Sequence, residues 1–218
     1  MRIHQIPVKP MTPENACGLG RVIDDFEAAE VTIVPWSQQG WRAVTRGDEG
    51  GITQGAFKTA WRGELLMGLS DSFEVDNFHT EYILGWSRDP AEANPQAIAP
   101  SRVQILVSLI HYHPDGGQVF ASRHRRPFLL LLAPPGDDVR PVDCVALHSD
   151  GSVGFHIDPG VWHQAPFTLA EEDVFENKQG RVHAVVECIF PEEQGLYLSV
   201  PLPRTRPHRL ASPSEREE

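Results

Sequence analysis

Two short histidine-rich segments, residues 111–118 and 156–163, carry the residue types most suited to chemistry. The first reads His-Tyr-His-Pro-Asp-Gly-Gly-Gln and the second reads His-Ile-Asp-Pro-Gly-Val-Trp-His. Successive side chains of a β-strand point to opposite faces, so His111 and His113 are expected to project to the same side. A third imidazole from the second segment would complete either a metal site or an acid/base site.

Both kinds of site remain open from the residues alone. His111, His113 and His163 could hold one divalent metal ion, because three imidazoles are a common ligand set. Alternatively, His113, His156 and His163 could act as catalytic acids and bases, because imidazole titrates near neutral pH. Each histidine also has a purely structural explanation, as a hydrogen-bonded group at the end of a strand.

Four other residues are candidates for substrate binding, namely Gln118, Arg123, Trp162 and Glu187. Arg123 starts a basic cluster that is either a carboxylate clamp or a solvated turn, and a guanidinium can bind a carboxylate through two hydrogen bonds. Glu187 lies in an apolar run and needs a partner if it is buried. Gln118 could instead bridge buried backbone groups, and Trp162 is expected to line the core or a pocket.

Many short apolar segments surround these residues and predict an all-β barrel or sandwich. They lie at residues 21–23, 31–34, 41–44, 52–61, 65–67, 78–86, 103–111, 117–121, 128–133, 142–147, 152–157, 182–190 and 196–200. The 19 prolines and 18 glycines suit the turns between them. One helix of about two turns is expected from Pro13, with Thr12 as its N-cap.

We expect a single domain over residues 1–202. In this interpretation residues 1–100 add extra strands, and residues 101–202 form the core of the barrel. Residues 88–100 contain three prolines and four alanines and are expected to form a connecting loop. Residues 203–218 are rich in proline, arginine and glutamate, which predicts a disordered tail.

The net charge of −11 argues against a nucleic acid or an anionic membrane as partner. A small anionic substrate remains compatible, because it responds to the local field of a pocket. The odd number of cysteines, at positions 17, 144 and 188, predicts free thiols and a reducing, cytoplasmic setting. Residues 1–10 lack the apolar core of a signal peptide, and the apolar run at 128–133 is too short to span a bilayer.

The two histidine segments resemble the paired motifs of the cupin fold, a double-stranded β-helix or jelly-roll barrel. His111, His113 and Gln118 match the first motif, and Pro159-Gly160 with His163 match the second. Cupins usually have a glutamate where this chain has Gln118. The loss of that negative ligand is expected to weaken the binding of a divalent metal.

A wider set of residues resembles the ureidoglycolate lyase family, which was formerly called ureidoglycolate hydrolase. The resemblance rests on residues 113–120, the apolar strand at 128–132, and Val161-Trp162-His163 before Pro166-Phe167. With the opening of the chain it covers roughly residues 5–25 and 102–190. The segment at about 30–98 differs from the family, Gln164-Ala165 replaces its second histidine, and His111 is additional.

The resemblance implies the cleavage of ureidoglycolate to glyoxylate and urea, a step of purine (allantoin) breakdown. It also implies a homodimer, and a divalent metal ion could assist the histidine chemistry. The additional His111 leaves open another metal-dependent cupin enzyme, such as a dioxygenase or an isomerase. A cupin that only binds a small ligand is a third reading, because this fold serves many purposes.

Overall fold

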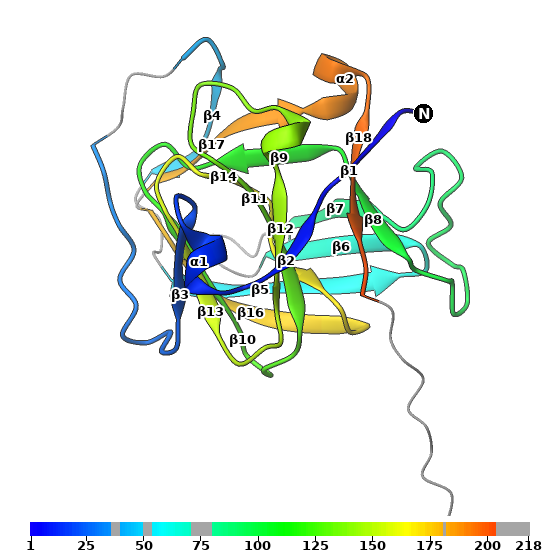
Figure 1. Cartoon of the computed structure of the whole chain (residues 1–218), viewed down its shortest axis with the longest axis horizontal. Helices are drawn as coiled ribbons and strands as arrows, with labels where there is room; N and C mark the ends of the chain where they lie inside the picture. The colour runs from blue at the N-terminus through cyan, green and yellow to red at the C-terminus, as the bar shows by residue number, and fades with distance from the viewer. Residues whose placement is uncertain (36–39, 50–53, 71–79, 181, 204–218) are drawn as a thin grey trace, which may run out of the picture.

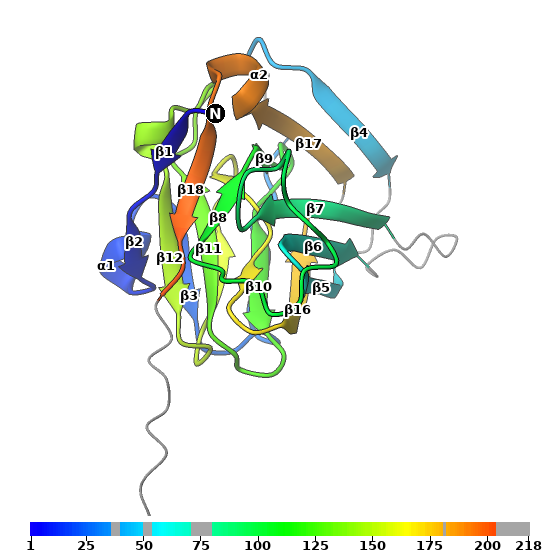
Figure 2. The same cartoon turned by 90° about the vertical axis from the view of Figure 1, so that its right-hand side faces the viewer.

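The computed structural model describes residues 1–35, 40–49, 54–70, 80–180 and 182–203. Within them the chain forms two large β-sheets and short helices, which is a cupin-type all-β fold (Figures 1 and 2). This confirms the predicted fold class. The helices are α1 (Pro13–Ala16), the 3₁₀ helix η1 (Pro141–Asp143) and α2 (Phe190–Gln194).

The first sheet has ten strands, and each is hydrogen-bonded to the next in the row. Their order is β1 (Ile3–Gln5), β18 (Tyr197–Pro201), β8 (Gln104–Val107), β7 (Thr80–Trp86), β6 (Leu65–Ser70), β5 (Gln54–Arg62), β16 (Glu172–Gln179), β10 (Gln118–Ser122), β13 (Gly154–Ile157) and β3 (Gly20–Ile23). Strands from the first hundred residues are therefore built into this sheet. β5, β6 and β7 lie between β16 and β8, both of which come from the second half of the chain.

The second sheet has eight strands. They run in the order β2 (Val8–Pro10), β12 (Val145–Ser149), β11 (Phe128–Ala133), β14 (Trp162–His163), β9 (Leu109–Tyr112), β17 (Val182–Ile189) and β4 (Val44–Glu49), and β15 (Phe167–Thr168) also pairs with β11. All six residues of β11 are buried, so both of its faces are covered. Burial of this apolar run contributes to the hydrophobic stabilisation of the fold.

The apolar run at 103–111 forms two strands where one was expected. The chain bends at Ser108, so that β8 pairs with β18 in the first sheet while β9 pairs with β14 and β17 in the second. The carbonyl of Ser108 accepts a hydrogen bond from the backbone N–H of Phe190 at 2.8 Å, which satisfies the backbone at the bend. This switch of sheet brings His111 into the second sheet.

The helices differ modestly from the expectation. α1 has a single turn, with Thr12 as its N-cap: the Thr12 side chain accepts a hydrogen bond from Asn15 N–H. α2 was not expected, because five residues show no helical periodicity. It ends at Gly195, whose φ of 66° suits a glycine.

Some of the predictions fall outside the described residues. Most of the predicted tail, residues 204–218, is among them, as are residues 52–53 and 78–79 of two predicted strands. No helix in the described part of the chain has the length and apolar character needed to cross a membrane.

We predict that Gly117→Ala destabilises the fold by about 1–3 kcal/mol, the usual range for overpacking. A Cβ at position 117 would overlap the backbone carbonyl oxygen of Ile157 and lie 3.2 Å from His156 Cε1. The free energy of unfolding from urea titration measures the change. Gly136→Ala is the matched control, because the nearest atom to its Cβ is 3.4 Å away. Equal stability of the two variants would contradict the prediction.

Candidate active site

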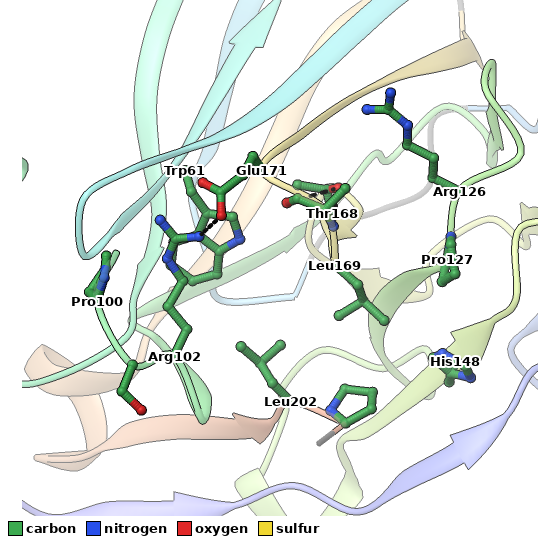
Figure 3. A pocket seen from close by; sticks show the side chains of 13 residues that line it. Trp61, Pro100, Arg102, Arg126, Pro127, His148, Thr168, Leu169, Glu171 and Leu202 are labelled. Carbon is green, nitrogen blue, oxygen red and sulfur yellow. Dashed lines mark hydrogen bonds and ion pairs between the residues drawn. The ribbon is translucent and has the colours of Figure 1, made fainter. Parts of the chain in front are cut away.

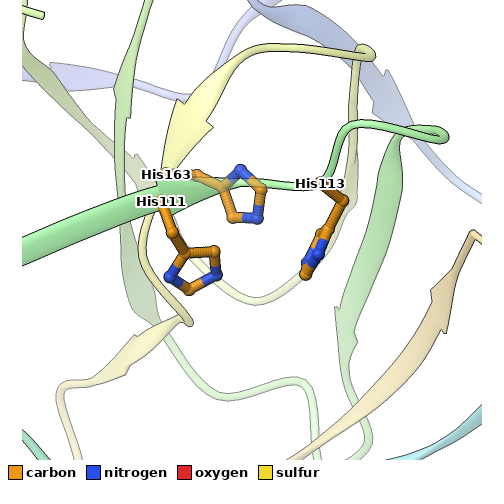
Figure 4. A group of neighbouring side chains, drawn as sticks. All are labelled: His111, His113 and His163. Carbon is orange, nitrogen blue, oxygen red and sulfur yellow. The ribbon is translucent and has the colours of Figure 1, made fainter. Parts of the chain in front are cut away.

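Three histidines converge at the second sheet, as Figure 4 shows for His111, His113 and His163. One ring nitrogen of each lies within 4.8 Å of the others. The ring centroids of His111 and His163 are 4.9 Å apart, those of His113 and His163 are 5.3 Å apart, and those of His111 and His113 are 5.4 Å apart. The structure thus brings together the three residues that were predicted as metal ligands.

The register of the sheet explains this meeting. β9 lies between β14 and β17, and His111 is directly opposite both His163 and Glu187. Residues directly opposite one another in an antiparallel sheet share a face, so all three project to the same side. His113 is two residues after His111, immediately beyond the end of β9, and joins them there.

Gln118, the first residue of β10, adds an amide oxygen to the cluster. Its Oε1 lies 2.8 Å from His163 Nε2 and 3.2 Å from His113 Nε2. On its other side the Gln118 amide nitrogen donates hydrogen bonds to Asn177 Oδ1 at 3.0 Å and Gln179 Oε1 at 3.4 Å. These two bonds fix the amide so that its oxygen faces the imidazoles.

The backbone fixes the other nitrogen of two rings. His113 Nδ1 lies 2.9 Å from the carbonyl oxygen of Ala184, and His163 Nδ1 lies 2.8 Å from that of Val161. A carbonyl oxygen can only accept, so Nδ1 of each ring carries the proton and donates it. In a neutral ring Nε2 is then left with its lone pair directed toward Gln118 Oε1.

Burial keeps both rings neutral. His113 is 5% exposed and His163 is 2% exposed. Loss of hydration lowers the pKa of His113, against the opposing effect of its hydrogen bonds. Burial, with repulsion from His113, lowers the pKa of His163 to about 3.

This donor set fits a divalent metal ion. Two Nε2 lone pairs and an amide oxygen point toward one place, where a cation would relieve the repulsion between them, and His111 adds a third imidazole. Nδ1–H bonds from ligand histidines to backbone carbonyls are the usual outer support of such sites. Four neutral ligands would leave the full double charge of the ion available to an anionic substrate.

The structure does not bring His156 into this cluster. His156 is directly opposite Val119 in the β10–β13 pair, whereas Gln118 is opposite Ile157. Neighbouring residues of a strand face opposite ways, so His156 points away from the histidine cluster. It is fully buried there, with its Nε2 against Thr32.

The other predicted substrate-binding residues lie in three different environments. Arg123 is half-exposed and pairs with Glu176 at 2.5 Å, as expected of a residue in a solvated turn. Trp162 is a core residue on the face opposite His163, where its Nε1 donates to the carbonyl of Gly136. Glu187 shares the face of His111 and is half-buried.

Two residues of this polar centre were missed in the sequence, Asn177 and Gln179. They alternate with exposed or half-buried residues along β16 and share a buried face with Phe175. In the sequence, Asn177 and Gln179 follow Phe175 at every second position. This alternation is the signal that could have identified them as residues of the buried face.

A separate hollow of about 820 Å³ lies away from the histidines (Figure 3). Trp61, Arg102, Leu169 and Leu202 are among the residues that line it. It opens beside Thr168, which pairs with Phe128 at the start of β11, whereas His163 pairs near the end of that strand. The hollow is therefore not part of the histidine site.

We predict that the metal-free protein loses stability as the pH falls below about 6.5. The unfolded chain binds protons on its histidines near that pH, whereas the lowered pKa values keep His113, His156 and His163 neutral in the folded state. His163 contributes a loss of roughly 1 kcal/mol per pH unit that continues toward pH 3. His113 and His156 add to this loss in the same direction. Urea unfolding between pH 7.5 and 4.5 measures this slope.

The matched variants for this prediction are His163→Gln and His148→Gln. The first removes one buried neutral imidazole. It is expected to lower the number of protons taken up on unfolding by about one, and so to flatten the dependence of the free energy of unfolding on pH. The second changes a half-exposed histidine of β12 and is expected to leave the loss below pH 6.5 in place. An unchanged slope in His163→Gln would contradict the assignment.

We also predict that the dialysed protein binds close to one Zn²⁺ or Mn²⁺ per chain. His113→Ala and His163→Ala are expected to lose this binding, whereas His148→Ala retains it. Gln118→Glu should tighten binding by about tenfold or more, because it adds a negative ligand. Calorimetric titration with each metal measures these changes, and native-like affinity in His163→Ala would refute the site.

Comparisons with known proteins point to one family. A family model described as ureidoglycolate lyase matches residues 72–195, more than half of the chain and a range that contains the whole histidine cluster. A ureidoglycolate lyase of Azotobacter vinelandii is 31% identical over 99 residues, which are 44% of this chain and 60% of that protein. One of Pseudomonas entomophila is 35% identical over 99 residues, which are 44% of this chain and 58% of that protein.

The matched region thus spans no more than about 60% of the length of these two relatives. The family match nevertheless covers β7 to α2, the part of the fold that supplies His111, His113, Gln118 and His163. On that extent of match, the chain belongs to the ureidoglycolate lyase family.

Proposed function

We propose that this protein is a lyase that cleaves ureidoglycolate, or a closely related small hydroxy or ureido acid, to glyoxylate and urea. The observation that carries the proposal is the convergence of His111, His113 and His163 within the segment matched by the family. The names of the relatives support the substrate, since they are called ureidoglycolate lyases.

The reaction requires only one net proton transfer. The hydroxyl proton of the carbinol carbon leaves, the O–C bond becomes a carbonyl as the C–N bond breaks, and the nitrogen of the departing urea gains a proton. One proton carrier that returns its proton to the urea nitrogen therefore balances the reaction. The site must also hold the carboxylate of the substrate and the charge that develops on the oxygen.

We assign the three histidines and Gln118 to holding a divalent metal ion. A pKa of about 3 makes His163 a weak base at neutral pH but a good neutral ligand. When bound, the ion would supply Lewis-acid polarisation of the hydroxyl and carboxylate oxygens. Asn177 and Gln179 keep the amide oxygen of Gln118 directed at the site.

Glu187 is the proposed proton carrier. It lies directly across from His111 on the same face of the sheet and is half-buried, so its carboxylate is close to the cluster without being sealed from substrate. Its oxygen would take the hydroxyl proton and return it to the urea nitrogen.

We further propose that the protein works in the cytoplasm, in purine breakdown, as a homodimer. Its ligand in this proposal is a small anion, with neither nucleic acid nor membrane as partner, and the net charge of −11 supports the exclusion of these two. Light scattering of the full chain tests the dimer.

We predict release of urea and glyoxylate in equal amounts when the purified full chain is given racemic ureidoglycolate. Chelation is expected to stop the release, and a divalent ion to restore it. His163→Ala and Glu187→Gln should each lower kcat/KM at least about 100-fold, as removal of a proton carrier or of metal support commonly does. Coupled assays of both products measure the rates.

His148→Ala is the control for these variants, because His148 lies on β12 and outside the histidine cluster. Release that survives chelation would contradict the role of a metal and support direct acid/base chemistry by the histidines. No release under any condition would refute the proposed substrate.

A further inference from the structure

The segment before residue 36 lies along the turn that connects β9 to β10. The carbonyl of Thr32 accepts a hydrogen bond from Gly117 N–H at 2.9 Å, and Val34 N–H donates to the carbonyl of Asp115 at 2.9 Å. Ile33 and Gly116 form an antiparallel bridge between these two bonds. The turn is thus paired with a segment some eighty residues away, which runs along the outside of the fold in Figure 1.

This turn carries two members of the histidine site. His113 stands at its start and Gln118 follows its end, and both must be correctly placed for Gln118 Oε1 to lie 3.2 Å from His113 Nε2. A shift of the turn by 1 Å would therefore separate the amide oxygen from one imidazole or press it against the other.

His156 holds the outer segment in place. Thr32 N–H donates a hydrogen bond to His156 Nε2 at 3.2 Å, and Thr32 Oγ1 lies 3.2 Å from the same nitrogen. Because Nε2 accepts from the backbone, the proton of the neutral ring is on Nδ1, which lies 3.4 Å from Asp158 Oδ1. The carboxylate thus favours the tautomer that Thr32 requires.

The ring of His156 also supports the turn directly. It is 0% exposed, and a Cβ placed on Gly117 would lie only 3.2 Å from its Cε1. The imidazole therefore fills the space between β13, the Thr32 segment and Gly117. A smaller or apolar side chain would leave either a void or an unsatisfied Thr32 N–H.

We propose that His156 is a positioning residue for the histidine site, because it fixes the turn that carries His113 and Gln118 through its bond to Thr32. It touches neither the reacting atoms nor the proposed ligands, and it acts from the opposite face of the sheet. Its kinetic effect rests on the proposed function, but its effect on the geometry of the turn does not.

The test compares His156→Leu, His156→Gln and His148→Gln in the full chain. Leucine keeps much of the volume but has no acceptor for Thr32 N–H, whereas the side-chain oxygen of glutamine can take the place of Nε2. We expect His156→Leu to weaken Zn²⁺ binding by about 10- to 100-fold, the range seen for residues that orient ligands. His156→Gln should restore affinity to within about threefold of the native protein, and His148→Gln should leave it unchanged.

Amide hydrogen exchange of the metal-free chains provides a readout that needs neither metal nor turnover. In His156→Leu, the amides of Gly117 and Val34 are expected to exchange at least about tenfold faster, while those of β11 and β12 keep their native protection. In the native protein, the amides of Thr32, Val34 and Gly117 should open together, because they belong to one hydrogen-bonded unit.

Native-like affinity and exchange in His156→Leu would overturn the proposal. Independent opening of the Thr32 and Gly117 amides in the native protein would also overturn it, even where His156→Leu fails to fold. A protein that releases no urea from ureidoglycolate, but shows the expected exchange pattern, would refute the proposed function and leave this role of His156 in place.

Discussion

One buried amide holds the polar centre of this barrel together. Gln118 directs its oxygen at His113 and His163 and its nitrogen at Asn177 and Gln179, so that it connects the two sheets through buried polar atoms. A buried polar group is stable only when its partners are present. The strands that bear these partners must therefore stay in register, and a slip of one residue would turn every partner to the other face.

Backbone carbonyl groups set the protonation of the histidine rings at this site. The carbonyls of Ala184 and Val161 determine which nitrogen of each imidazole carries the proton, and burial keeps the rings uncharged. The chain thus presents lone pairs rather than N–H groups to the centre. A neutral but electron-rich group of side chains of this kind favours the binding of a cation.

The sequence was most informative where strand periodicity decides the outcome. The His-x-His spacing correctly predicted that His111 and His113 share a face, and the Pro-Gly turn correctly brought His163 to them. The register between strands could not be predicted, because it depends on which strands pair with each other. His156 therefore lies on the far face although its segment was identified, and Asn177 and Gln179 were not recognised as neighbours of Gln118.

The sequence also carries no signal for the end of a strand at Ser108 or for the short helix α2. The alternation over residues 103–111 is continuous in the sequence, and only tertiary contacts show that Ser108 divides it between two sheets. The short helix α2 has too few residues for a periodic signal. These are positions at which packing overrides local propensity.

β5 and β6 lie in the middle of the first sheet, so the strands beside them depend on them for backbone hydrogen bonds. β16 pairs with β5 on one side and with β10 on the other. β5 and β16 are more than a hundred residues apart in the sequence. A fragment limited to residues 72–195 would lack β5 and leave β16 with a free row of backbone donors and acceptors. Such an edge recruits strands from other molecules, so β5 covers an edge of β16 that would otherwise favour aggregation, through a long-range pairing that forms slowly during folding.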